Sequence, residues 1–191
     1  MPQDAPNTAG SLSHALDAYA PAKIAERVAM AGVAKATLSL VPLFTLAVLA
    51  GAFIALGAVF YLTVTFQFGP GPGPAKLVGG IVFSLGLVLI VVGGAELFTG
   101  NNLIILARCD GLIGTGALLR NWGVVYAGNF AGAAATAVLV ALSGILGSET
   151  GDIAEHARKI AAAKITLPWD QAFFRGILCN TLVCLAVWLC F

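Results

Sequence analysis

The chain has 191 residues, of which 59% are hydrophobic and only 10% are charged, and its formal net charge is +1. A soluble domain carries about 25% charged residues, so this composition excludes a soluble globule and a disordered chain. The small net charge also gives no reason to expect nucleic acid as a partner. We therefore predict an all-α polytopic membrane protein, whose helices each need about 20 residues to cross the bilayer.

The cysteines and histidines offer no metal site. The 4 cysteines include no CxxC pair and the 2 histidines are His14 and His156, so a zinc ligand set is missing. We interpret the thiols as buried, small hydrophobic groups. No GxSxG, HExxH or phosphate-loop motif occurs either. The sequence thus predicts no enzyme activity, no metal and no cofactor.

Residues 1–35 form a polar, alanine-rich segment that lacks the short apolar core of a signal peptide. Residues 21–35 predict a short interfacial helix, with Ile24 and Val28 toward lipid and Lys23 and Arg27 toward water. A solvated tail is the alternative. Because the segment carries basic residues, the positive-inside rule predicts a cytoplasmic N-terminus.

The gaps between charged residues divide residues 36–191 into a transmembrane domain. We expect spans at about 38–66, 76–107, 116–145 and 171–191, with the second span broken at 96–102. The alternating glycines and prolines of residues 69–74 predict an external turn. Small residues at helical spacing, such as Gly128 and Gly132, favour close helix packing. The last apolar stretch is short for a hydrocarbon core about 30 Å thick, so we expect a chain truncated within or just after the fourth span.

The middle of the second apolar stretch is polar for a bilayer-spanning helix. Between Gly93 and Asn102 it contains a carboxylate, a hydroxyl, amides and several glycines. Glycine and asparagine weaken a helix, and irregular backbone at membrane depth is tolerated only inside protein or beside a wet cavity. We favour a broken helix at a transporter's substrate site over a plain turn between two shorter helices.

Three motifs resemble the formate/nitrite transporter family, in matching order and spacing. The segment Gly94-Ala95-Glu96-Leu97-Phe98-Thr99 resembles the break in that family's second helix. Asn121-Trp122, followed by Gly128-Asn129, resembles the third helix, and residues 175–188 resemble the fourth. The resemblance extends from about Lys35 to the end of the chain.

The resemblance implies an aquaporin-like helical bundle of six spans with a broken second helix, of which this chain would hold four. It also implies a homopentamer in the bacterial inner membrane, a multi-pass plasma-membrane protein with one pore per subunit. The implied substrates are small monovalent anions or their neutral acids, such as formate, nitrite, hydrosulfide or acetate. Neither NPA motif of the aquaporins occurs in the chain, which disfavours a water channel.

The resemblance also assigns residues to the pore. Phe83 and Leu87 resemble its apolar constriction toward the outer side, and Leu97 and Phe98 resemble its constriction toward the cytoplasm. Ordinary core packing is the alternative for these side chains. Thr99 resembles the family's pore hydroxyl, for which a helix-breaking cap is the alternative.

Further residues are assigned to the anion path and to the loop. Lys164 and Asn180 have the spacing of the family's lysine and pore-side amide, and a cation at a pore mouth attracts anions. A solvated loop lysine is the alternative for Lys164. Glu96, Gly100 and Asn101 are assigned to the structure of the loop. We expect the Glu96 carboxylate to accept backbone N–H bonds, with direct proton handling as the alternative.

The implied mechanism is proton-linked passage. A bare anion loses its hydration at a ring of Phe and Leu side chains, whereas the neutral acid is tolerated there. The family's proton-relay histidine belongs to a Phe-Glu-His motif that would lie beyond Phe191, so no relay is assigned. Two other classes remain. One is a haem-binding membrane subunit, which is poorly supported because this chain has no histidine in its expected spans. The other is a non-transporting membrane scaffold or assembly subunit.

Overall fold

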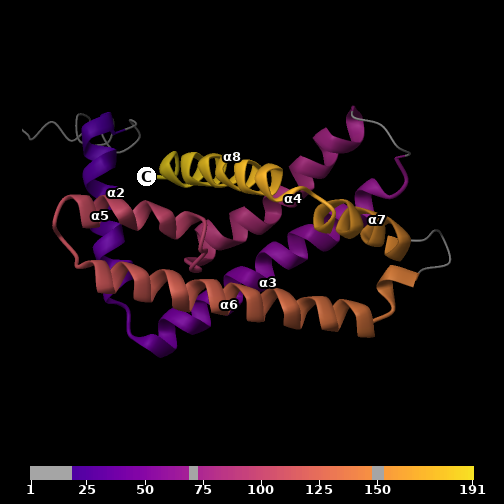
Figure 1. Cartoon of the computed structure of the whole chain (residues 1–191), viewed down its shortest axis with the longest axis horizontal. Coiled ribbons are helices and arrows are strands. Elements are labelled where there is room, and N and C mark those ends of the chain that lie inside the picture. Colours follow the sequence, from indigo (N-terminus) through magenta and orange to yellow (C-terminus); the bar gives the residue numbers. More distant parts are fainter. Residues whose placement is uncertain (1–18, 69–72, 148–152) are drawn as a thin grey trace, which may run out of the picture.

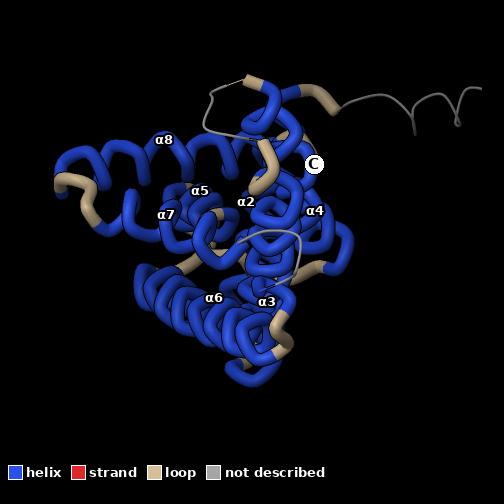
Figure 2. The backbone as a smooth tube through the Cα atoms, turned by 90° about the vertical axis from the view of Figure 1, so that its right-hand side faces the viewer, coloured by secondary structure: helices blue, strands red, loops and turns tan. Residues whose placement is uncertain are grey.

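The computed structural model describes residues 19–68, 73–147 and 153–191. Every regular element in these residues is a helix, and Figure 2 shows no strand among them. The predicted turn at 69–74 and the first half of the N-terminal segment fall largely outside the described residues. The elements are α2 (Pro21–Thr37), α3 (Leu40–Thr65), α4 (Pro74–Gly93), η1 (Gly100–Ile104), α5 (Ile105–Cys109), α6 (Thr115–Leu142), η2 (Ile145–Gly147), α7 (Ile153–Ile165) and α8 (Trp169–Trp188).

Four of the described helices, α3, α4, α6 and α8, are long and apolar enough to cross a membrane. This confirms the all-α class that the composition predicts. In Figure 1 these helices extend across the molecule, with α2 and α5 at the left end and α7 at the right end. The more polar helices, α2 and α7, therefore lie at the two ends of an apolar bundle.

Helices α3 and α6 pack at backbone distance because each presents glycine to the other. A Cβ atom at Gly132 of α6 would overlap the carbonyl oxygen of Val48 on α3, and one at Gly51 of α3 would overlap the carbonyl oxygen of Asn129. On another side of α3, a Cβ at Gly57 would lie 3.0 Å from a backbone oxygen of α4. The predicted role of small residues in helix packing thus has a specific geometry here.

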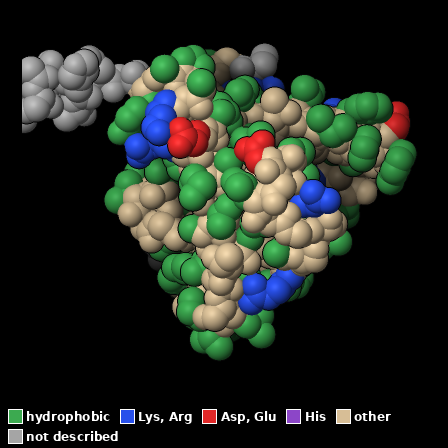
Figure 3. Space-filling model, turned by 90° about the vertical axis from the view of Figure 1, so that its left-hand side faces the viewer, with side chains coloured by type: hydrophobic (Ala, Val, Ile, Leu, Met, Phe, Trp, Pro, Cys, Tyr) green, Lys and Arg blue, Asp and Glu red, His purple; other side chains and the backbone are tan. Residues whose placement is uncertain are grey.

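Helix α2 packs on protein along one face. Its buried residues are Val28, Ala29, Gly32 and Ala36, and a Cβ at Gly32 would lie 3.2 Å from the Ala107 side chain of α5. The expectation that Val28 faces lipid is therefore wrong, because this residue is only 2% exposed. Figure 3 views this end of the molecule, where Lys, Arg, Asp and Glu side chains lie among hydrophobic ones.

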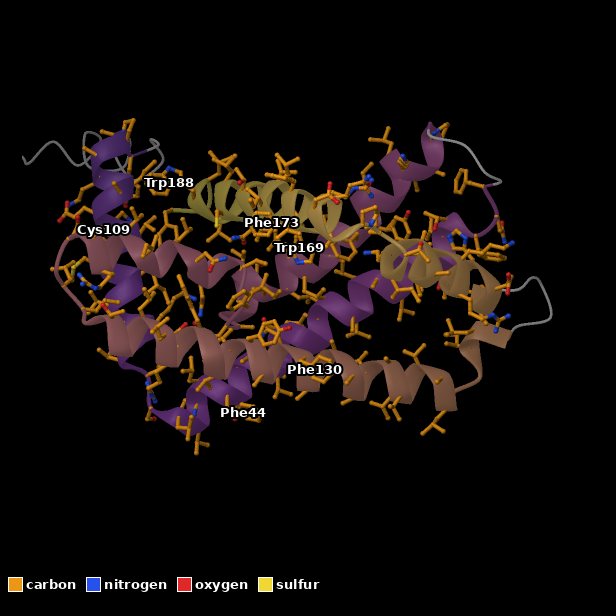
Figure 4. The ribbon with its side chains drawn as sticks, viewed as in Figure 1. Phe44, Cys109, Phe130, Trp169, Phe173 and Trp188 are labelled. Carbon is orange, nitrogen blue, oxygen red and sulfur yellow. The ribbon has the colours of Figure 1, made fainter. Side chains whose placement is uncertain are left out.

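Helix α8 lies along one side of the bundle and buries no residue. Its first turns carry exposed aromatic rings, with Trp169 and Phe173 stacked 5.6 Å apart (Figure 4). The expectation of buried thiols is wrong for three cysteines: Cys109, Cys179 and Cys190 are exposed, and only Cys184 is half-buried. Cys179 is exposed because α8 buries none of its faces, which the hydropathy pattern could not reveal.

Candidate functional site

The interruption after α4 begins at a glycine that ends the helix. Gly94 adopts a φ of 66°, a left-handed conformation that favours glycine at the end of a helix. The N–H of Ala95 still donates to the carbonyl oxygen of Ile90 at 3.0 Å. The next N–H, that of Glu96, instead donates to the carbonyl oxygen of Leu46 on α3 at 3.2 Å. Residues 95–99 thereby leave α4 and form an irregular segment, which hydrogen-bonds to α3 before η1 begins at Gly100.

The amide of Asn129 on α6 holds this irregular segment in place. Its Nδ2 group donates to the carbonyl oxygen of Ala47 at 2.8 Å and to that of Glu96 at 2.9 Å. Its Oδ1 atom accepts from the N–H of Phe98 at 2.8 Å. One side chain thus bonds to three backbone groups, of which the Phe98 N–H and the Glu96 carbonyl oxygen lie outside any helix and need such a partner in an apolar bundle.

A polar cluster joins the segment to α2. The Lys35 ammonium lies 2.7 Å from the Glu96 carboxylate and donates to Asn101 Oδ1 at 3.2 Å. The other Glu96 oxygen accepts from Asn101 Nδ2 at 2.7 Å. The carboxylate thus accepts from side chains, whereas we expected backbone N–H donors. Both Glu96 and Asn101 are buried, so these bonds offset much of the cost of placing a charge in the protein.

The cluster continues into the start of α6. Asn101 Nδ2 also donates to Asn121 Oδ1 at 2.9 Å, and Asn121 Nδ2 donates to the Lys35 carbonyl oxygen at 3.1 Å. The Trp122 indole donates to the Asn101 carbonyl oxygen at 3.0 Å. The C-terminal end of α2, the irregular segment and α6 are therefore tied by a single network of hydrogen bonds.

The predicted inner constriction residues lie on the irregular segment itself. Leu97, Phe98 and Thr99 line a cavity of about 300 Å³ between α3 and α6. Leu97 also lines a second cavity of about 340 Å³, which contains Lys35, Glu96 and Gly100. The irregular segment therefore lies between two cavities, and the Lys35–Glu96 pair lines only one of them.

The neighbours of Phe98 and Thr99 differ in kind. The Phe98 ring meets the Tyr126 ring edge-on with 5.4 Å between centroids, and that of Trp122 at 6.5 Å. The backbone oxygen of Thr99 accepts from the Cys184 thiol of α8 at 3.3 Å. Among the described residues the Thr99 hydroxyl makes no hydrogen bond, so it is free to meet a polar group in the cavity.

The predicted outer residues fall in separate places. Phe83 of α4 and Lys164 of α7 line one cavity of about 590 Å³ at the α7 end of the bundle. Leu87 is half-buried on α4. Asn180 of α8 lines another cavity, of about 250 Å³, and its buried Oδ1 atom has no hydrogen-bond partner in the described part of the chain. The structure thus brings Phe83 to Lys164 but does not bring Asn180 to them.

Sequence reasoning missed two positions that organise the site. Lys35 was assigned to the N-terminal segment, yet it pairs with Glu96, 61 residues further along the chain. Asn129 was noted only as part of a motif. An amide and a glycine one residue apart in an apolar span were a usable signal, because a buried amide needs hydrogen-bond partners.

The family profile described as formate/nitrite transporter matches residues 22–191. The chain belongs to this family. It is thus a multi-pass membrane protein of a family of channels and transporters rather than of enzymes. The family membership that the motifs predicted is confirmed.

Relatives and solved structures agree with this assignment. The chain is 45% identical to the formate channel FocA of Escherichia coli strain K12 over 174 residues, which cover 91% of this chain and 61% of that protein. An FNT family ion channel superposes with a TM-score of 0.79 at 30% identity, covering 87% of this chain and 67% of that one. A pentameric formate channel with formate bound gives a TM-score of 0.72 at 41% identity, covering 78% and 59%. The chain therefore spans about three-fifths of the length of the curated relatives it matches.

Proposed function

We propose that this protein passes formate and related small monovalent anions, or their neutral acids, across the membrane. One observation carries the proposal: the irregular segment 95–99 is held in the apolar bundle by buried polar groups and borders two cavities. Irregular backbone at membrane depth is typical of transporter substrate sites. Relatives named as formate channels support formate as the first substrate to test.

The path follows the long direction of the bundle. An anion enters at the α7 end, where Lys164 contributes positive charge to the cavity that Phe83 lines. Phe83 and Leu87 form the outer apolar constriction, and Leu97 and Phe98 form the inner one. A bare anion loses hydration at each constriction, so we propose that the species crossing them is the protonated acid. The Thr99 hydroxyl offers a hydrogen bond between the two.

The assembly and its orientation are part of the proposal. The protein forms a homopentamer in the bacterial inner membrane, with each subunit forming its own pore and α2 on the cytoplasmic side. The pentameric structure to which the chain is similar supports the oligomer. The open faces of α8, which bury no residue, support an aquaporin-like bundle in which further membrane helices pack on this one. The intact mass of the protein from its native membrane tests that point.

The test of the function is formate flux into liposomes that contain the full-length protein. Wild type accelerates the uptake of labelled formate over protein-free vesicles. Thr99→Val, which keeps the shape of the side chain and removes its hydroxyl, lowers uptake about tenfold or more, since an unmet polar group in a desolvated site costs about 1–3 kcal/mol. Thr99→Ser retains uptake. Thr63→Val is the control, because among the described residues the Thr63 hydroxyl bonds only to the Val59 carbonyl oxygen of its own helix.

The competing class is a membrane scaffold that transports nothing. For a scaffold, wild type gives no flux above empty vesicles, and Thr99→Val assembles and behaves as wild type does. Normal assembly with wild-type flux, followed by loss of flux in Thr99→Val alone, excludes the scaffold. A wild type that carries neither formate nor nitrite overturns the proposal.

A further inference from the structure

The cavity at the α7 end contains a second cation, which sequence reasoning did not assign. Lys76 of α4 lines the same 590 Å³ cavity as Lys164 of α7. The two lysines are the charged groups in its lining, and apart from Tyr61 the remaining lining residues are apolar or glycine. Two ammonium groups from two different helices therefore share one hollow, with the Phe83 ring in its wall. Figure 1 shows α7 beside the ends of α3 and α4.

Neither ammonium is neutralised by a carboxylate in the part of the chain that the structure describes. The contrast with the rest of α7 is clear. Arg158 and Lys159 lie 2.9 and 3.8 Å from the carboxylate of Glu155. Arg158 and Lys159, outside the cavity, are thus paired, whereas the two lysines that line it have no carboxylate partner among the described residues.

We propose that Lys76 forms with Lys164 a two-lysine site that recruits a small carboxylate at the mouth of the pore. The proposal rests on the proposed function, since it concerns the entry of the same substrate. Two cations facing one hollow raise the local concentration of a monovalent anion more than one cation does. The apolar wall beneath them gives the anion no further stabilisation, so it binds here before it loses its charge or its hydration.

The role of Lys76 is recruitment, which fixes the kinetic signature. Loss of an exposed attractive charge weakens the capture of the anion and leaves the steps beyond Phe83 unchanged. The half-saturating formate concentration therefore rises while the maximal flux stays the same. Because the site is open to water, salt screens the effect, with a Debye length of about 8 Å at physiological ionic strength and about 3 Å at 1 M.

The experiment measures formate flux against formate concentration in liposomes that contain the full-length protein, at low and high ionic strength. Lys76→Gln raises the half-saturating concentration about two- to fivefold at low salt, the range of an exposed charge interaction, and has little effect at 1 M salt. Lys76→Arg restores the wild-type value. Lys159→Gln is the matched control, because Lys159 is an exposed lysine of α7 outside the cavity, and it behaves as wild type.

A binding measurement separates this inference from the proposed function. Broadening of the carbon-13 formate signal by the detergent-solubilised protein reports binding without transport. Broadening that Lys76→Gln weakens supports the two-lysine site even where flux is absent and the transport proposal fails. The inference is overturned where Lys76→Gln matches wild type at low salt, where Lys159→Gln has the same effect, where wild type does not bind formate, or where Lys76→Arg fails to restore the loss.

Discussion

Lys35 and Glu96 form an ion pair of 2.7 Å whose two members differ in their access to water: the lysine side chain is 32% exposed and the glutamate side chain only 5%. The pair connects α2 to the irregular segment across 61 residues of sequence. A lysine can extend its ammonium toward water when it loses its partner. The buried carboxylate has no such route, so the pair is energetically asymmetric.

The asymmetry predicts unequal effects of the two single substitutions. Lys35→Met leaves a buried carboxylate with Asn101 as its remaining donor and lowers stability by about 3 kcal/mol. Glu96→Gln leaves a lysine that can reach solvent and costs less, about 1 kcal/mol. Thermal unfolding of the purified protein in detergent, followed by intrinsic fluorescence, compares them. Lys23→Met is the control, because the Lys23–Glu26 pair is more than half exposed on both sides; equal destabilisation by all three substitutions would contradict the argument.

The three hydrogen bonds of the Asn129 amide predict that a small change in this side chain lowers both stability and flux. Asn129→Ala leaves the Glu96 carbonyl oxygen and the Phe98 N–H without their partner, at a cost of about 1–3 kcal/mol for each group that stays dry. We expect a lower midpoint of thermal unfolding and a loss of formate flux in the protein that remains folded. Asn129→Asp does not restore either property, because a carboxylate cannot donate to the two carbonyls. A wild-type flux in Asn129→Asp would refute the positioning role.

The α3–α6 contact predicts that alanine substitutions at two glycines of α6 differ sharply in their effect on folding and stability. Gly132→Ala places a methyl group on the backbone oxygen of Val48, so the helices must separate and the yield of folded protein falls. Gly123→Ala, on the same helix, meets no atom within 4 Å. It is neutral or stabilises α6 slightly, by less than about 1 kcal/mol. Monodispersity on size-exclusion chromatography and unfolding temperature compare the two, and equal behaviour would count against glycine-mediated packing.

We predict that the Phe98 side chain sets the selectivity of uptake between acids of different size. Its ring is held edge-on by Tyr126 at 5.4 Å, and Phe98→Ala removes the largest side chain of the inner constriction. We expect uptake of acetate to increase relative to uptake of formate, because a wider constriction gives more room to the larger acid. Liposome uptake of both labelled acids gives the ratio. Phe44→Ala is the control, since Phe44 lies exposed on α3 (Figure 4); an unchanged ratio in Phe98→Ala would place the constriction elsewhere.

Several features of the site were within reach of the sequence and others were not. The polar stretch between Gly93 and Asn102 identified the segment, because carboxylates and amides are costly at membrane depth and demand a reason. Their partners could not be read in the same way. Glu96 bonds to side chains of α2 and η1, and Asn129 reaches back to α3, since hydrogen-bond partners depend on how helices cross rather than on spacing along the chain.

The sequence by itself determined the helical class and the family, because the first follows from hydropathy along the chain and the second from motifs of a few residues. The tertiary structure decided which residues meet. It buried Val28 against protein, left Cys109, Cys179 and Cys190 exposed, placed Lys76 and Lys164 in the lining of one cavity, and separated Asn180 from both. Apolar helices present no charge pattern that fixes their rotation or their neighbours, so close packing of glycines and the pairing of a few buried polar groups decide the arrangement.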